Sequence, residues 1–183
     1  MEPCLEDLFY KYSVTKLSSK NYARNLTRLI TFLVSKGRFL EARFYLDQLE
    51  KTHSKNIISI RLGYKLAITL FDNKKVVKYD SLLLERKNYF ELEWYRLQYY
   101  YSVNNIPEII KSTEFLLSKK NLEQEYIQTI LEAVWNIRDY KLSVILHKYI
   151  IKNRMRLAPQ IEQLIRNIVL EKLRDSLAKY KNV

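Results

Sequence analysis

Residues 22–51, YARNLTRLITFLVSKGRFLEARFYLDQLEK, decide the fold of this chain. Apolar residues recur on both sides of the turn at 36–39 with the three- and four-residue steps of an α-helix: Leu26, Leu29, Ile30 and Leu33 before it, Phe39, Ala42, Leu46 and Leu49 after it. Two such stripes joined by a short turn predict a helical hairpin. One hairpin is too small to bury both stripes, so it requires neighbours of its own kind.

The composition favours long helices joined by short connections. Among 183 residues there are only two glycines and three prolines, while 48% are hydrophobic, which argues against an all-β fold. The single cysteine, Cys4, excludes an intrachain disulfide. We see neither a signal peptide nor an apolar run of the roughly 18 residues that a membrane span needs. We therefore expect a soluble intracellular protein without a membrane partner, cytoplasmic or, in a eukaryote, nuclear.

The helix–turn–helix pattern recurs about every 34 residues, as in helical solenoids. We predict its turns at Gly37, at Asn73 or Lys74, at Asn105 and at Arg138. The prediction is an all-α, right-handed α-solenoid of about four helical hairpins in a single domain. Its parts are a lead-in helix at 1–19, repeats at 20–53, 57–87, 90–119 and 122–153, and a C-terminal capping helix at 158–181.

The segment GRFLEA at 37–42 resembles the inter-helix turn of a tetratricopeptide repeat. That pattern has a glycine, a polar residue, an aromatic residue that fills the wedge between the helices, and an alanine that lets them cross closely. The third unit resembles the family through Trp94, Leu97 and Tyr101, whereas the second unit lacks the pattern at its turn. The first unit is also similar to a pentatricopeptide repeat, a related hairpin that binds single-stranded RNA.

In tetratricopeptide-repeat proteins the first helices of successive hairpins line a concave groove. The resemblance therefore implies a partner-binding groove formed by Arg24, Thr27, Thr31, Arg61, Tyr64, Tyr95, Tyr99, Gln128, Glu132, Trp135 and Asn136. An RNA groove should be basic along its whole length, because each phosphate contact releases a counterion. This groove is basic at one end and acidic at the other, which favours a peptide or helix of a partner protein. For Tyr95 and Tyr99, packing between repeats is the competing interpretation, and Trp94 is predicted in the core.

The chain is basic overall, with a net charge of +12. Residues 148–183 carry nine basic side chains and three acidic ones. A basic surface is predicted at Lys148, Lys152, Arg154, Arg156, Arg166, Lys172 and Arg174. Such a stretch is either a solvated helix face or a contact site for nucleic acid or an acidic protein.

The sequence offers little for catalysis. His53 and His147 have no Cys, Asp or Glu companions at metal-ligand spacing, and two glycines cannot form a phosphate-binding loop. We predict a non-enzymatic scaffold or adaptor without cofactor or metal. It would bind a partner peptide or helix in the groove or serve as a subunit of a larger complex. The alternatives are RNA binding through the basic surface and self-association through apolar stripes.

Overall fold

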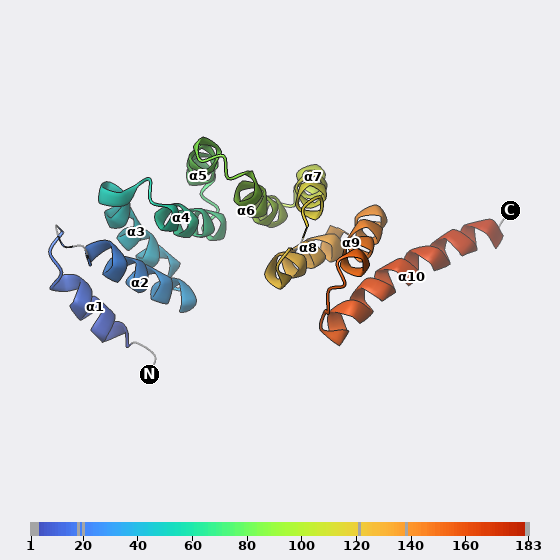
Figure 1. The fold of residues 1–183 in the computed structure, drawn as a ribbon, viewed down its shortest axis with the longest axis horizontal. Helices are drawn as coiled ribbons and strands as arrows, with labels where there is room; N and C mark the ends of the chain where they lie inside the picture. Colours follow the sequence, from blue (N-terminus) through green and yellow to red (C-terminus); the bar gives the residue numbers. More distant parts are fainter. Residues whose placement is uncertain (1–3, 18, 20, 121, 138, 182–183) are drawn as a thin grey trace. The chain divides into compact units, whose positions relative to one another are not determined.

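The computed structural model describes residues 4–17, 19, 21–120, 122–137 and 139–181 (Figure 1). It does not describe the side chains of residues 124, 160, 161, 164, 172, 175, 176 and 178–181. The helices are α1 (Leu5–Ser13), α2 (Tyr22–Ser35), α3 (Phe39–His53), α4 (Ile57–Thr69), α5 (Asn73–Glu85), α6 (Tyr89–Ser102), α7 (Ile106–Leu117), α8 (Gln124–Ile137), α9 (Tyr140–Lys152) and α10 (Pro159–Lys181).

The all-α prediction is confirmed for these residues, which contain helices and no strand. Consecutive helices pack against each other, and their starting residues recur at a regular interval. Helices α3, α5, α7 and α9 begin at residues 39, 73, 106 and 140, a recurrence of 33 or 34 residues. This interval agrees with a helical-repeat architecture. In the ranges given above, every helix is too short or too polar to pass through a lipid bilayer.

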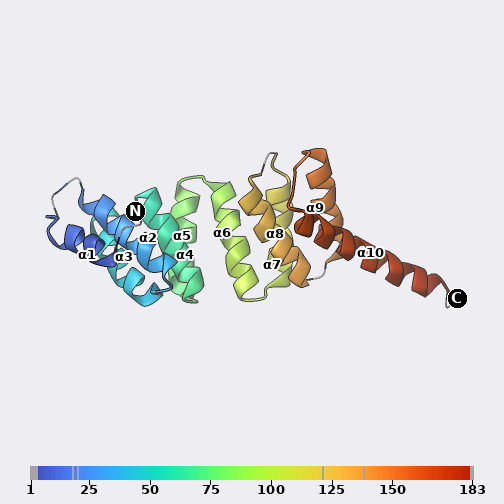
Figure 2. The ribbon, with the colours of Figure 1, turned by 90° about the horizontal axis from the view of Figure 1, so that it is seen from below.

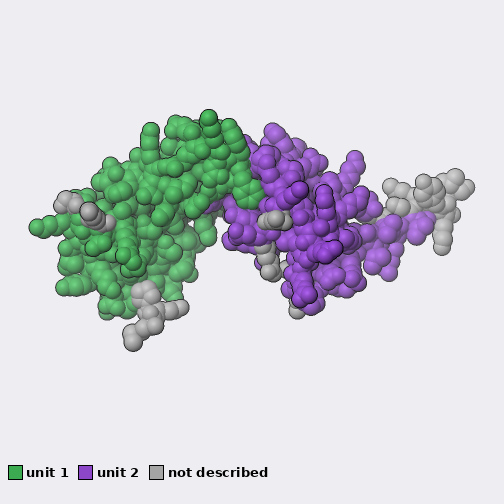
Figure 3. Space-filling view, in the orientation of Figure 1, with its two compact units in different colours: residues 1–92 green, residues 93–183 purple. Residues whose placement is uncertain are grey.

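Contacts divide the chain into two compact units, residues 1–92 and 93–183 (Figure 3). The boundary falls inside α6, so its first residues belong to the first unit and the rest to the second. Each unit is described by itself below. The single domain expected from the sequence stays a prediction.

In the first unit, α2 is the central helix. It packs against α1, α3 and α4, while α4 also contacts α3 and α5 (Figures 1 and 2). Its residues Leu26, Leu29, Ile30 and Leu33 are fully buried, as the opening stretch predicts. Tyr45 of α3 meets Phe9 and Tyr12 of α1 at ring-centroid distances of 5.7 and 5.4 Å. The lead-in helix is therefore part of the core of this unit.

A row of polar contacts joins α3 to α5 and to Asp72, the residue that precedes α5. Glu50 accepts hydrogen bonds from the Tyr79 hydroxyl and from Lys78 Nζ, both at 2.6 Å. Arg43 pairs with Asp72 at 2.7 Å. These partners are 28 or 29 residues apart, so the row ties α3 to a helix that begins 34 residues later in the chain.

Five of the described helices end with the same backbone turn. Gly37, Phe71 and Asn104 follow α2, α4 and α6 with φ of 71°, 54° and 54°. The amide after each of them donates to a carbonyl five residues earlier at 2.9 Å: Arg38 to Leu33, Asp72 to Ala67, and Asn105 to Tyr100. After α5 and α9 the left-handed residues are Lys87 and Arg154, with φ of 55° and 48°, and the next amide donates to the carbonyl of Leu83 at 3.2 Å and of Ile150 at 3.1 Å. This is a Schellman-type cap, which requires a left-handed residue.

The second turn differs from its prediction by two to three residues. Helix α5 begins at Asn73, where the sequence suggested a turn, because the Asp72 side chain caps the helix by accepting from the Lys75 amide at 3.2 Å. The turn at Gly37 is confirmed, and Asn105 directly precedes α7. Arg138 lies outside the described residues.

In the second unit, α9 packs against α7, α8 and α10 (Figure 2). Trp94 is buried, as predicted, and its ring meets that of Tyr126 edge-on at 4.5 Å. Along α10, Ile165 and Ile168 are buried, whereas Leu173 and Leu177 are exposed. Of these four apolar residues of the predicted capping helix, the two earlier ones are covered.

Candidate functional site

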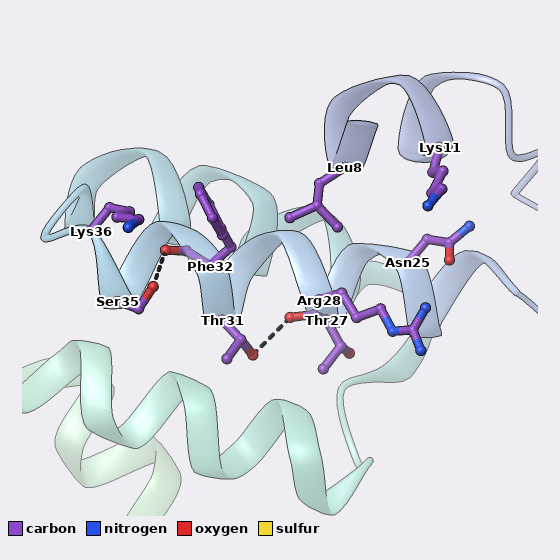
Figure 4. A pocket seen from close by; sticks show the side chains of 9 residues that line it. All are labelled: Leu8, Lys11, Asn25, Thr27, Arg28, Thr31, Phe32, Ser35 and Lys36. Atoms are coloured by element: carbon purple, nitrogen blue, oxygen red, sulfur yellow. Dashed lines mark hydrogen bonds between the residues drawn. The ribbon is translucent and has the colours of Figure 1, made fainter. Parts of the chain in front are cut away.

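A hollow of about 540 Å³ runs along α2 on the first unit (Figure 4). We call it the α2 groove. Its lining residues come from α1 and from α2 with the residue that follows it: Leu8, Lys11, Asn25, Thr27, Arg28, Thr31, Phe32, Ser35 and Lys36. Figure 4 shows Leu8 and Lys11 reaching from α1 toward α2. The groove therefore exists because α1 packs beside α2.

Two rows at four-residue steps form the α2 side of the groove, because side chains four residues apart lie on the same helix face. One row carries hydroxyl groups and the other combines a ring with two cations. The rows are Thr27, Thr31 and Ser35, and Arg28, Phe32 and Lys36. Thr31 Oγ1 donates to the Thr27 carbonyl at 2.9 Å. Its hydroxyl oxygen keeps lone pairs that can accept a further hydrogen bond.

The charge of the α2 groove has one sign. Lys11, Arg28 and Lys36 line it, and no carboxylate is among its lining residues. None of these three cations forms an ion pair with a residue that the structure describes. Lys36 Nζ lies 5.5 Å from the centroid of the Phe32 ring. The hollow thus offers apolar surface at Leu8 and Phe32 beneath positive charges.

Of the groove residues predicted in the first unit, some line the α2 groove and others lie elsewhere. Thr27 and Thr31 do line the α2 groove. Arg24 is exposed on α2, one turn before Arg28, but does not line the hollow. Arg61 is exposed on α4 and pairs with Glu91, its second guanidinium nitrogen lying 3.1 Å from Glu91 Oε2.

The prediction that Tyr64 lines an exposed groove is wrong. Its side chain is fully buried between α4 and α5, with its hydroxyl donating to Asp80 and its ring centroid 6.1 Å from that of Tyr79. Helix α4 contacts α2, α3 and α5, so a wider part of its surface is covered than one apolar stripe suggests. An amphipathic pattern does not reveal a helix that is covered on several sides.

Four predicted residues lie together along α8 in the second unit. Gln128 Nε2 donates to Glu132 Oε1 at 3.2 Å, and Asn136 Nδ2 donates to the Glu132 carbonyl at 2.8 Å and to the Tyr101 hydroxyl. Trp135 is 37% exposed. This face of α8 is therefore accessible, as the sequence predicts. Whether it forms one groove with the first unit stays a prediction.

Tyr95 and Tyr99 are half-buried on α6. The rings of Tyr99 and Tyr100 are 5.7 Å apart at an angle of 52°. Each of the two side chains is thus partly covered and partly accessible, and contact with a partner stays a prediction for both.

Four residues of the predicted basic surface line two smaller hollows of the second unit. Lys148 and Lys152 line one of about 230 Å³, whereas Arg154 and Arg156 line another of about 380 Å³ between α9 and α10. Arg166 pairs with Glu162 at 2.8 Å, and Arg174 is exposed on α10. The Lys172 side chain lies outside the described residues.

Sequence reasoning missed most of the α2 groove. The row of Arg28, Phe32 and Lys36 is visible as a four-residue period next to Thr27 and Thr31. Leu8 and Lys11 could not be found this way, because their place depends on the packing of α1 against α2. In the first of the smaller hollows, Lys119 and Lys120 were missed for the same reason.

The described residues contain no group of three or more His, Cys, Asp or Glu side chains placed to hold a metal ion. Comparison of the chain with protein-family models, with curated proteins and with solved structures found no match.

Proposed function

We propose that this chain is a non-enzymatic interaction module that holds an acidic peptide or helix of a partner protein in the α2 groove. In this proposal the helices form a right-handed, tetratricopeptide-like solenoid of about four hairpins, which acts as a scaffold or adaptor. The repeat interval of 33 or 34 residues supports this architecture.

One observation carries the proposal: the α2 groove combines a sizeable hollow, an apolar lining and three cations without a carboxylate. Peptide-binding sites typically join an apolar anchor pocket to a few placed polar groups. Phe32 supplies the accessible apolar contact, and Thr31 supplies a hydrogen-bonding group. The charges fit a segment that bears carboxylates around an apolar side chain, because complementary charge steers and selects partners.

Phe32 argues against a nucleic acid in this groove. Single strands are held by stacking bases on open aromatic faces. Here Lys36 Nζ already lies over one face of the Phe32 ring, 5.5 Å from its centroid. Leu8, which is largely buried, offers no stacking surface either.

The test compares two charge reversals on the same helix. Arg28→Glu changes a groove residue, while Arg24→Glu makes the same change one turn away, outside the hollow. Tagged full-length protein carrying each variant is purified from its native cells with and without nuclease. Captured proteins are identified by mass spectrometry, and their binding is measured with purified components.

We expect a protein partner that resists nuclease, binds through an acidic segment, and loses about tenfold or more in affinity with Arg28→Glu but not with Arg24→Glu. The proposal fails if the two variants behave alike, if nuclease removes the partner, or if the binding segment is basic. As a control, circular dichroism should show that both variants are folded.

A further inference from the structure

We propose that the second unit carries a separate binding site for the phosphate groups of a nucleic-acid strand. The site is the hollow of about 230 Å³ at the C-terminal ends of α7 and α9. We call it the lysine hollow; its lining residues are Leu117, Ser118, Lys119, Lys120, Ile145, Lys148, Tyr149, Lys152 and Asn153. This inference goes beyond the proposed function, because it concerns another unit and another class of partner.

Four lysines and no carboxylate line the lysine hollow. Lys119 and Lys120 follow the end of α7, and Lys148 and Lys152 stand one turn apart on α9, a helix that contains no acidic residue. None of the four forms an ion pair with a described residue. Lysines at a four-residue step repel each other, so this arrangement is unfavourable in the free protein.

The partial negative charges at the C-terminal ends of α7 and α9 balance only part of the positive charge of the four lysines. A helix C-terminus carries about half a negative charge and attracts cations in its last turn. Two such ends therefore offset about one of the four positive charges. Lys119 has in addition a ring contact, its Nζ lying 4.8 Å from the Phe115 centroid. A surplus of positive charge remains that the fold itself does not balance.

Each of the other polar side chains of the lysine hollow already makes one hydrogen bond within the protein. Ser118 Oγ donates to the Phe115 carbonyl at 2.6 Å, and Asn153 Nδ2 donates to the Tyr149 carbonyl at 2.8 Å. The Tyr149 hydroxyl accepts from the Leu122 amide at 2.9 Å. The lysine ammonium groups are thus the main donors left for a ligand, and they suit a polyanion.

Only one large apolar side chain of the lysine hollow is exposed, which favours phosphates over an acidic peptide. Of its larger apolar residues, Leu117 and Tyr149 are buried, and only Ile145 is exposed, at 38%. Protein segments bind through apolar or aromatic anchors that become buried, and one exposed isoleucine offers few such contacts. A strand held by lysines alone is bound through its backbone and without sequence preference.

The test measures binding of the full chain to a labelled oligouridine strand by fluorescence anisotropy over a series of KCl concentrations. The variant Lys148→Gln/Lys152→Gln removes two of the four lysines, while Lys65→Gln/Lys74→Gln removes the same charge from exposed positions of the first unit. Because the first variant relieves a like-charge contact, we expect it to fold. Circular dichroism and thermal unfolding will check that it does.

We expect affinity to fall with salt and the hollow variant to bind about tenfold more weakly at low salt. The slope of log K against log[KCl] should shrink by about 1.4, since each phosphate contact of a single strand contributes about 0.7. The control should keep the slope of the wild type. Equal slopes for the two variants, no binding at low salt, or equally good displacement by polyglutamate of matched charge would each overturn the proposal.

Discussion

Gly63 of α4 and Tyr79 of α5 lie in direct contact: a Cβ atom at Gly63 would come within 2.6 Å of Tyr79 Cε1, closer than real Cβ contacts allow. The Tyr79 ring is fully buried, and its hydroxyl donates to Glu50 Oε1 at 2.6 Å. The ring therefore has little freedom to move away. Gly63 is required here for close packing of two helices, and not for an unusual backbone conformation.

We expect Gly63→Ala to lower the free energy of unfolding by about 1–3 kcal/mol, the usual cost of overpacking. Glycine to alanine in a helix normally stabilises by roughly 0.5–1 kcal/mol, so the sign of the effect is diagnostic. Urea unfolding measures it. In a Tyr79→Leu background the same change should cost much less, because the overlapping ring is gone. An equal cost in both backgrounds would contradict the contact.

The left-handed turn residues give a second prediction. Gly37 has φ of 71° and open space around it, whereas Lys87 after α5 has φ of 55°. Gly37→Ala should destabilise and Lys87→Gly should stabilise, each by about 1 kcal/mol, because side chains disfavour this region. Thermal unfolding checks both. Ser81→Gly, at an exposed position inside α5, serves as the control and should destabilise; a stabilising effect there would point to another cause.

The dependence of stability on alkaline pH gives a third prediction. Burial, followed by the hydrogen bond to Glu50, raises the pKa of Tyr79 above its ordinary value of 10. Below pH 10 the phenol is protonated in both states and its stabilising contribution is complete. Above it the unfolded chain ionises first, so the free energy of unfolding should fall by up to about 1.4 kcal/mol per pH unit for this group.

The pH slope is measured by urea unfolding above the ordinary pKa of tyrosine. Tyr79→Phe should flatten it. Tyr10→Phe, at an exposed position, should leave it unchanged. Burial also raises the pKa of Tyr22 and Tyr45, so part of the slope should persist in the Tyr79 variant. Equal slopes in all three proteins would show that Tyr79 does not retain its proton on folding.

The helices were predictable because their apolar period is local. The stripe at Leu26, Leu29 and Leu33 is visible in the sequence and buried in the structure. What the pattern could not show is which helices are covered on several sides. Tyr64 was therefore assigned to the surface, although it is fully buried against α5.

The candidate sites were predictable only in part, because each combines segments that are distant in sequence. Thr27 and Thr31 were found from their place on α2, whereas Lys11 joins them only when α1 packs alongside. Lys148 and Lys152 were noticed as local charge, but Lys119 reaches the same hollow from the end of α7. Spacing within one helix is readable from a sequence, and contact between helices requires coordinates.

The caps at Gly37, Phe71 and Asn104 carry a further consequence. Each is closed by a main-chain amide and a main-chain carbonyl, so the identity of the side chain at the left-handed position matters little for its geometry. A glycine, a phenylalanine and an asparagine end their helices in the same way. The same backbone turn can therefore recur along the chain without a recurring residue at its left-handed position.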